Sequence, residues 1–287
     1  MPLCFFVSDL HGKIERYRKL FAQIKTEKPA AIFLGGDLLP SGLFSFTSNP
    51  DVPEDFIEFL FKNLSELKSD MGDDYPQIFT ILGNDDGKSL ETEFIKADAE
   101  GLIVYAHNKK TLFYGFTIYG YAYIPPTPFM LKDWERYDVS QYIDPGCIAP
   151  EDGSFSVETD IKLNKYKTIK KDLDKLTGTG DLSNSIFLFH APPYKTNLDR
   201  AALDGKMIDH VPLDVHIGSI AIKRFIENRQ PYITLHGHVH ESTTLTGKWK
   251  ENIGKTLAMN AAHNGPELSL IRFDLHAPDK ATRELIF

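Results

Sequence analysis

Compact apolar runs alternate with helical patterns along the first third of the chain. Residues 4–8, 30–34 and 77–82 are short apolar runs closed by polar residues or glycine, which predicts buried strands. Between them, residues 12–26 and 56–67 carry apolar positions at helical spacing. Strand, helix, strand, helix, strand is the order of a sheet with crossover helices, so the predicted fold class is α/β.

The pattern changes in the second half of the chain. Residues 114–121 predict a strand or hairpin arm, residues 185–189 and 232–235 predict strands, and residues 220–228 predict a helix. The last predicted strands, which have no long helices between them, are residues 243–245, 255–259, 268–274 and 283–286. We expect these four to form a second, more antiparallel sheet that packs on the first.

One long segment, residues 122–160, shows little periodicity and is rich in proline and glycine. Its aromatic residues are Tyr123, Phe129, Trp134, Tyr137 and Tyr142. Long irregular segments in compact domains often act as lids or binding loops. A surface insertion packed by its own aromatic residues fits the pattern equally well. We predict a single domain over residues 1–287 that carries this segment as an insertion, and both roles stay open.

Composition narrows the class of protein and its partners. Of the 287 residues, 42% are hydrophobic and 25% are charged, which is typical of a soluble globular protein. The net charge of -8 disfavours long nucleic acids as partners, because phosphate contacts need clustered Lys and Arg. No apolar run approaches the ~20 residues that span a bilayer. Residues 1–7 lack the basic region of a signal peptide, so we expect a cytoplasmic location and no membrane partner.

The residues that can carry chemistry follow the predicted strands. In open α/β sheets, binding sites form outside the carboxyl ends of the strands. His236, His238 and His240 carry most weight here, because three imidazoles so close in sequence serve no packing purpose. The candidates are Asp9, His11, Asp37, Asn84, Asp85, Asp86, His190, His236, His238 and His240.

These residue types indicate metal ions and phosphate chemistry. Mixed imidazole, carboxylate and amide ligands favour Mn or Fe, with Zn, Co and Ni as alternatives, over Ca. The absence of thiolates among the candidates disfavours a structural zinc site. A carboxylate shared by two ions ~3.5–4 Å apart clamps a phosphoryl group, and a hydroxide between the ions can attack phosphorus. We therefore predict two divalent metal ions and the hydrolysis of a phosphate mono- or diester.

Five blocks of the sequence resemble the signature of the calcineurin-like metallophosphoesterase family. That signature reads D-x-H, G-D-x-x, G-N-H-[DE], a lone His and G-H-x-H. The corresponding residues here are DLH at 9–11, GDLL at 36–39, GNDD at 83–86, His190 and GHVH at 237–240. Four blocks match, and the third departs at one position.

The resemblance implies a four-layer α/β/β/α sandwich of two mixed sheets, with a dinuclear metal site at the sheet edge. It also implies which ligands hold which ion. One ion would take Asp9, His11, Asp37 and His240, and the other would take Asp37, Asn84, His190 and His238. Asp37 would bridge the two ions. By the same resemblance, the catalytic residues would be Asp37, Asn84, Asp85 and His190.

Asp85 is the departure, because the family signature has His at this position. The resemblance assigns that His to protonating the leaving group or to binding the phosphate. A carboxylate protonates a leaving group only if its pKa is raised, whereas two nearby cations should lower its pKa. Asp85 therefore stays open between a catalytic role and that of a turn-forming residue. Asn84, Asp85 and His236 are the predicted substrate contacts.

Several weaker assignments and alternatives remain. His236 could instead orient a metal ligand, and Ser219 is predicted to cap the helix that follows it. Asn260 and His263 fall where the family often carries an Asn-Pro-Gly-Ser turn near the site. The favoured function is hydrolysis of a small phosphate ester. A nuclease and a protein-interaction scaffold of the same fold are the alternatives, and the sequence leaves the oligomeric state open.

Overall fold

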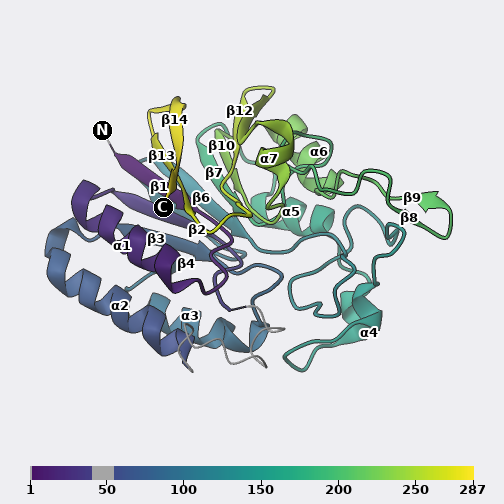
Figure 1. Ribbon diagram of the computed structural model, residues 1–287, viewed down its shortest axis with the longest axis horizontal. Coiled ribbons are helices and arrows are strands. Elements are labelled where there is room, and N and C mark those ends of the chain that lie inside the picture. The colour runs from purple at the N-terminus through teal and green to yellow at the C-terminus, as the bar shows by residue number, and fades with distance from the viewer. Residues whose placement is uncertain (1, 41–54) are drawn as a thin grey trace.

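Two six-stranded sheets lie face to face in the computed structural model, which describes residues 2–40 and 55–287 (Figure 1). The first sheet contains β1 (Leu3–Val7), β2 (Ala31–Gly35), β3 (Gln77–Ile81), β4 (Val104–Tyr105), β13 (Leu268–Asp274) and β14 (Ala277–Ile286). Its strand order is β14-β13-β1-β2-β3-β4. Strands β1 to β4 are parallel, whereas β13 and β14 form an antiparallel edge.

The second sheet is also mixed. It contains β5 (Lys110–Phe113), β6 (Phe116–Tyr121), β7 (Ser185–Phe189), β10 (Ile233–His236), β11 (Lys250–Ile253) and β12 (Thr256–Asn260). The strand order is β11-β12-β10-β7-β6-β5. The four central strands are parallel, and β5 and β11 pair with them as antiparallel edges.

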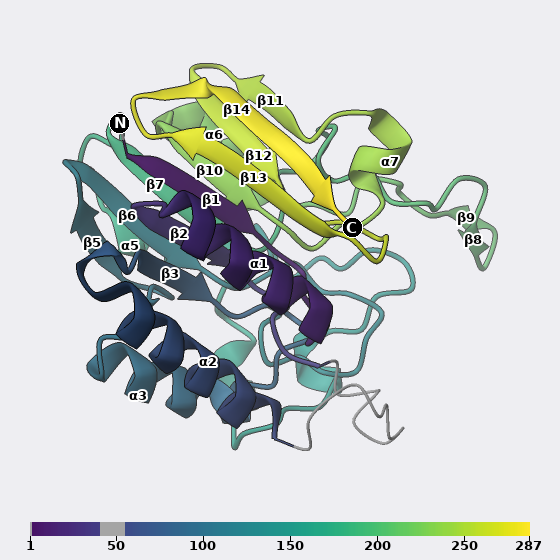
Figure 2. The ribbon, with the colours of Figure 1, turned by 60° about the vertical axis from the view of Figure 1, so that its left-hand side comes forward.

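Helices cover the outer face of each sheet, which completes four layers (Figures 1 and 2). On the first sheet lie α1 (Ile14–Glu27), α2 (Phe56–Met71) and α3 (Glu91–Ala99), and on the second lie α5 (Ile169–Thr177) and α6 (Ile220–Arg229). The predicted α/β/β/α sandwich of two mixed sheets is thus confirmed. Within residues 2–40 and 55–287, no helix has the length and apolar character needed to cross a membrane.

The remaining elements are short. They are α4 (Ile161–Asn164), α7 (Ser242–Thr246), the 3-10 turns η1 (Gly72–Asp74), η2 (Lys88–Leu90) and η3 (Pro150–Asp152), and a hairpin of β8 (Met207–Ile208) and β9 (Val211–Pro212). The hairpin projects from the right-hand end of the molecule in Figure 1.

Continuous apolar runs became central strands because both faces of those strands are covered. Every residue of β2 and β7 is buried, and so are the last four residues of β1. A strand between two layers needs apolar residues at every position, whereas a half-exposed strand alternates apolar and polar residues. The rings of Phe33 and Phe79 stack at 5.2 Å between centroids, and those of Tyr119 and Phe187 stack at 4.6 Å.

Two predictions for the end of the chain are wrong. Residues 243–245 lie in the short helix α7, not in a strand, because the N–H of Leu245 bonds to the carbonyl of Glu241 and Gly247 ends the turn at φ 70°. The last strands also form no separate sheet. β13 and β14 extend the first sheet beyond β1, whereas β11 and β12 extend the second beyond β10. These strands paired with the edge strands β1 and β10 of the two existing sheets, and not with one another as a separate sheet.

The segment at 122–160 is irregular but closely packed. Trp134 is fully buried and Tyr137 is 3% exposed, and an ion pair between Lys132 and Glu135 is buried with them. Isolated bridges order the segment internally, as between Ile124 and Glu135, and one joins Tyr137 to Thr168 outside it. Part of its aromatic content therefore serves packing.

Asp138, from the same segment, caps the N-terminus of α6. Its carboxylate accepts hydrogen bonds from the Ser219 hydroxyl at 2.6 Å and from the N–H groups of Ile220 and Ala221 at 2.6 and 3.1 Å. The Ser219 hydroxyl in turn accepts from the N–H of Ile222, which is the cap predicted from sequence. The negative charge also suits the positive end of the helix dipole.

We predict that Asp138→Ala destabilises the fold, because it leaves these buried donors without an acceptor. The expected loss in the free energy of unfolding is about 1–3 kcal/mol, measured by urea denaturation. Asp152→Ala, at an exposed position of the same segment, should change it little. Equal effects of the two substitutions would show that Asp138 does not anchor the helix.

Candidate metal centre

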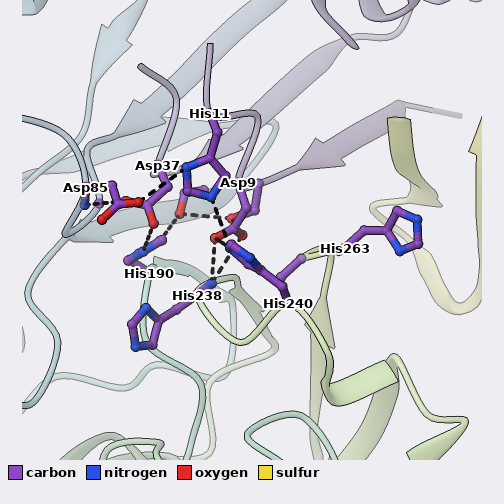
Figure 3. Close-up of polar contacts among 12 residues, drawn as sticks. Asp9, His11, Asp37, Asp85, His190, His238, His240 and His263 are labelled. Carbon is purple, nitrogen blue, oxygen red and sulfur yellow. Dashed lines mark hydrogen bonds and ion pairs between the residues drawn. The ribbon is translucent and has the colours of Figure 1, made fainter. Parts of the chain in front are cut away.

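The carboxyl ends of strands from both sheets meet at one edge and bring six of the seven predicted ligands together (Figure 3). The seventh, Asn84, lies beside His190. The first sheet contributes residues that follow β1, β2 and β3, and the second contributes residues that follow β7 and β10. These are Asp9, His11, Asp37 and Asn84 from the first sheet, and His190, His238 and His240 from the second. Parallel strands in each sheet place their carboxyl ends at a common edge, as expected for a site in an α/β fold.

Four of these side chains form one candidate ion site. Asp9, His11, Asp37 and His240 each offer a ligand atom within 4.8 Å of the others. The Nε2 atoms of His11 and His240 are 3.0 Å apart, and the Nε2 of His240 is 3.1 Å from an Asp9 carboxylate oxygen. Imidazole nitrogens that converge beside carboxylate oxygens are the donor set of a transition-metal site.

A second group shares Asp37. The ligand atoms of Asp37, His190 and His238 also lie within 4.8 Å of one another. The Nε2 of His190 is 3.3 Å from an Asp37 oxygen and 3.0 Å from the Asn84 amide oxygen. Its Nδ1 lies 2.8 Å from the carbonyl of Gly35, which orients the ring so that Nε2 faces the site. Asp37 is therefore common to both groups.

The charge balance of the site also fits cations. Asp9 is fully buried and Asp37 is 2% exposed. Within the described parts of the chain, their ion pairs are with His240 and His190, and no Lys or Arg reaches either carboxylate. Burying carboxylates is costly unless positive charge compensates them. Divalent ions at these ligands would supply it.

The pKa values show the same electrostatic coupling. Burial alone would raise the pKa of Asp9 and Asp37, but the neighbouring imidazoles outweigh burial and lower both. For His190, burial lowers the pKa, but Asp37 outweighs it and raises the pKa to about 10. A metal ion would have to displace the proton that Asp37 stabilises on His190, so binding should release protons.

The ligand loops hold unusual backbone conformations. Asp9, His11, Asp37 and His238 have positive φ angles of 58°, 48°, 51° and 72°. This left-handed region is uncommon for residues other than glycine, and such residues gather at functional sites where the surroundings enforce them. Here the N–H of Asp9 bonds to the carbonyl of Gly36 at 2.9 Å, and the N–H of His11 bonds to that of Asp37 at 2.8 Å. The first two ligand turns thus brace each other.

Two glycines let the ligands approach. A Cβ atom on Gly83 would lie 2.3 Å from an Asp37 carboxylate oxygen and 2.7 Å from the Nε2 of His190. On Gly237 it would lie 1.9 Å from the Ser8 hydroxyl. The glycines of the predicted motifs are therefore required by close contact across the site.

The side chain of Asp86 joins the turn that carries Asp37 to the turn that carries Asn84. Its fully buried carboxylate accepts hydrogen bonds from the N–H groups of Leu38, Leu39 and Gly83 at 3.1, 2.8 and 2.9 Å. Leu38 and Leu39 follow Asp37, and Gly83 precedes Asn84. Asp86 therefore sets the position of one turn relative to the other.

Arg16 and Ser8 support Asp9, and the sequence did not reveal them. The guanidinium of Arg16 donates to the Asp9 carbonyl and, from the other side, to the carbonyls of His263 and Gly265. The Ser8 hydroxyl donates to the Asp9 carboxylate. Arg16 is 2% exposed on α1. The sequence offered one indication of the role of Arg16, which is that a charged residue lies on the apolar face of the predicted helix.

Asp85 lies beside the ligands. Its N–H donates to an Asp37 carboxylate oxygen at 2.8 Å, and its own carboxylate lies 3.5 Å from the Nδ1 of His11. The Asp85 side chain is 33% exposed, so it can reach a molecule that approaches from solvent.

His236 and His263 do not join the ligand groups. His236 is fully buried, with Nδ1 at 2.8 Å from the Ala191 carbonyl and Nε2 at 2.8 Å from the Thr234 hydroxyl. With both nitrogens occupied and no exposed surface, it cannot contact a substrate, which contradicts that prediction. The His263 ring points away from the ligands in Figure 3 and pairs with Glu267 at 2.7 Å.

Comparison with known proteins relates this geometry to a family. The sequence profile of the calcineurin-like phosphoesterase family matches residues 4–242. The uncharacterized protein MJ1162 of Methanocaldococcus jannaschii is 34% identical over 82 residues, which cover 28% of this chain and 32% of that protein. The chain thus aligns with about a third of the length of this curated relative.

Solved structures share the fold at low identity. TT1561 of Thermus thermophilus superposes with a TM-score of 0.60 at 16% identity, covering 100% of this chain and 99% of that chain. A dimetal phosphatase from Danio rerio superposes with a TM-score of 0.50 at 11% identity, covering 94% of this chain and 91% of that chain. At such identities the likeness shows the fold alone.

We predict that the protein loaded with Mn²⁺ holds two ions per chain, because two ligand groups share a single carboxylate. Asp37→Asn keeps the size of the side chain and removes the shared negative charge, so at most one ion should stay tightly bound. Elemental analysis after desalting measures both. Asp152→Asn, at an exposed position, should retain two ions. One tightly bound ion in the wild type, unchanged in Asp37→Asn, would exclude the shared site.

Proposed function

The chain belongs to the calcineurin-like phosphoesterase family, and on that basis we propose that it hydrolyses small phosphate esters with two divalent metal ions. The observation that carries the proposal is the buried carboxylate of Asp37, which is common to both ligand groups. A shared carboxylate brings two ions close enough to act on one phosphoryl group. The other ligands would be Asp9, His11 and His240 for one ion, and Asn84, His190 and His238 for the other.

When bound, two such ions neutralise charge on the phosphate oxygens and lower the pKa of the water that attacks phosphorus. The protein's own residues orient the side chains that would bind the ions and the phosphate. Gly35 orients His190 toward Asp37. The Asn84 amide directs its oxygen toward His190 and its nitrogen toward Asp85. This amide can therefore act as a ligand through its oxygen and donate to a phosphate oxygen through its nitrogen.

The ligand types bear on which metal binds, and the retained ligands and net charge bear on the scaffold and nuclease alternatives. Imidazole, carboxylate and amide ligands suit Mn or Fe first, with Zn, Co and Ni next. A scaffold would be expected to lose ligands, whereas all seven predicted ligand positions are retained here. A nuclease needs a basic groove for its substrate, which the net charge of -8 disfavours.

A hydrolysis screen tests the proposal. With added Mn²⁺, we expect turnover of at least one compound among nitrophenyl phosphate, bis-nitrophenyl phosphate, cyclic nucleotides and nucleotides. Asp37→Asn should abolish that turnover, because it removes the shared ligand. Chelation followed by Mn²⁺ should remove and restore it. A wild-type protein that holds two ions and hydrolyses none of these esters would count against the proposed function.

The role of Asp85 depends on its pKa. Burial and the nearby Asp37 raise the pKa of Asp85 to about 7, whereas two divalent cations beside it would lower it. We propose that the cations dominate, so that Asp85 is ionised at neutral pH and is a poor proton donor. Its exposed position suits contact with substrate, but a carboxylate without a proton cannot assist an alkoxide leaving group.

We therefore predict faster turnover of nitrophenyl esters than of alkyl phosphate esters, because a nitrophenolate leaves without a proton. Asp85→Asn should have little effect on nitrophenyl esters, and Asp85→His should accelerate alkyl esters most. General acid catalysis is typically worth ~10²–10⁴-fold. A loss of that size in Asp85→Asn, restricted to alkyl esters, would show that Asp85 is an acid after all. Loss of bound metal in Asp85→Asn would instead assign it to the ligand shell.

A further inference from the structure

The irregular segment at 122–160 contacts the turn that follows Asn84 through Trp134. The indole ring is fully buried, and its Nε1–H donates to the main-chain carbonyl of Asp86 at 2.8 Å. Asp86 is two residues after Asn84, the ligand on that turn. A buried carbonyl needs a partner, so this hydrogen bond fixes the turn as well as the ring.

The turn from Asn84 to Lys88 is therefore held on two sides. On the inner side, the Asp86 carboxylate binds the turn that carries Asp37. On the outer side, Trp134 binds the Asp86 carbonyl, and the Asp133 carboxylate accepts from the N–H of Lys88 at 2.7 Å. The Lys88 ammonium lies 4.8 Å from the centroid of the Trp134 ring, which adds a cation–π contact at the end of the turn.

Trp134 is itself anchored to the second sheet. The N–H of Ile124 donates to the Trp134 carbonyl at 2.9 Å, and the N–H of Arg136 donates to the Ile124 carbonyl at 2.9 Å. Ile124 lies three residues beyond the end of β6, which is Tyr121. The Trp134 ring also packs edge-on against His107, at 5.0 Å between centroids. Trp134 thus connects a turn of the first sheet to a strand end of the second.

Trp134 makes this connection next to a ligand group whose members come from both sheets. Asp37 and Asn84 come from the first sheet, and His190 and His238 come from the second. Their spacing depends on how the two sheet edges are held at this point. We propose that Trp134 is a positioning residue that sets the affinity of the ion on Asn84 and His190, an inference that rests on the two-ion site proposed above.

The other ligand group provides an internal reference. Its turns at Asp9 and His11 are braced by hydrogen bonds to Gly36 and Asp37 and by Arg16, and none of these contacts comes from residues 122–160. The two groups share Asp37 alone, so a change at Trp134 should weaken the ion on Asn84 and His190 more than the other. A general loss of stability would weaken both.

The test is a calorimetric titration of Mn²⁺ into the full chain. Trp134→Phe retains an aromatic ring and removes the N–H. We expect one of the two dissociation constants to rise by about tenfold or more, as is typical when a group that supports a metal ligand is lost. The other should change much less, because Asp37 is the one ligand that the two groups have in common. Excess Mn²⁺ should restore turnover, because the ligands themselves remain.

Trp249→Phe is the matched control, since Trp249 is the second of two tryptophans and lies beside β11, away from the turn. Asp133→Asn weakens the acceptor at the other end of the turn and should raise the same dissociation constant, so it tests the proposal even if Trp134→Phe fails to fold. Two unchanged constants, or two that rise equally, in a folded variant would overturn it.

The titration separates this inference from the proposed function. A wild-type protein that binds two ions but hydrolyses no ester would refute the function, and the two dissociation constants would still decide the role of Trp134. A wild-type protein that binds one ion would refute the inference together with the two-ion site.

Discussion

The carboxylates of Asp9 and Asp37 are buried together where the two sheets meet, and the structure around them compensates this charge. Burial of carboxylates without positive charge is costly. The imidazoles of His240 and His190 reach them from the opposite sheet at 3.1 and 3.3 Å. The same arrangement brings together the candidate metal ligands. Because the candidate ligands come from both sheets, their spacing depends on the position of one sheet edge relative to the other.

Several contacts hold the ligand turns and the two sheet edges in position. Asp86 joins the turns after β2 and β3, and Arg16 joins the turn after β1 to the chain beyond β12. Trp134 connects the turn after β3 to the extension of β6. Gly83 and Gly237 leave the room that these close approaches need. The left-handed backbone at four ligands would be unfavourable in isolation and is tolerated because these contacts enforce it.

The departure from the family signature at Asp85 leaves the ligand geometry intact. It is the main-chain N–H of Asp85, and not its side chain, that bonds to Asp37. Any residue other than proline at this position offers the same N–H. A side chain can therefore change here without loss of the N–H that bonds to Asp37. Under the proposed function, the ligand set and the acid–base chemistry would thus be separable.

Sequence by itself determined the local features of this protein. Apolar runs identified β1, β2, β3, β7 and β10, and the polar residues directly after them identified the candidate ligands, because strand and turn preferences act over a few residues. The same motifs indicated the family, which the match over residues 4–242 confirms. Local preference failed at 243–245, where threonines favoured a strand but no partner strand lies alongside and the backbone closed into a turn of helix. Only the tertiary structure decided that β13 and β14 join the first sheet, that His236 is closed off from substrate, and that Arg16 and Trp134 brace the ligand turns. These outcomes depend on pairs such as Trp134 with Asp86 or Arg16 with Gly265, which lie far apart in the chain, and the pattern around one residue carries no information about its distant partner.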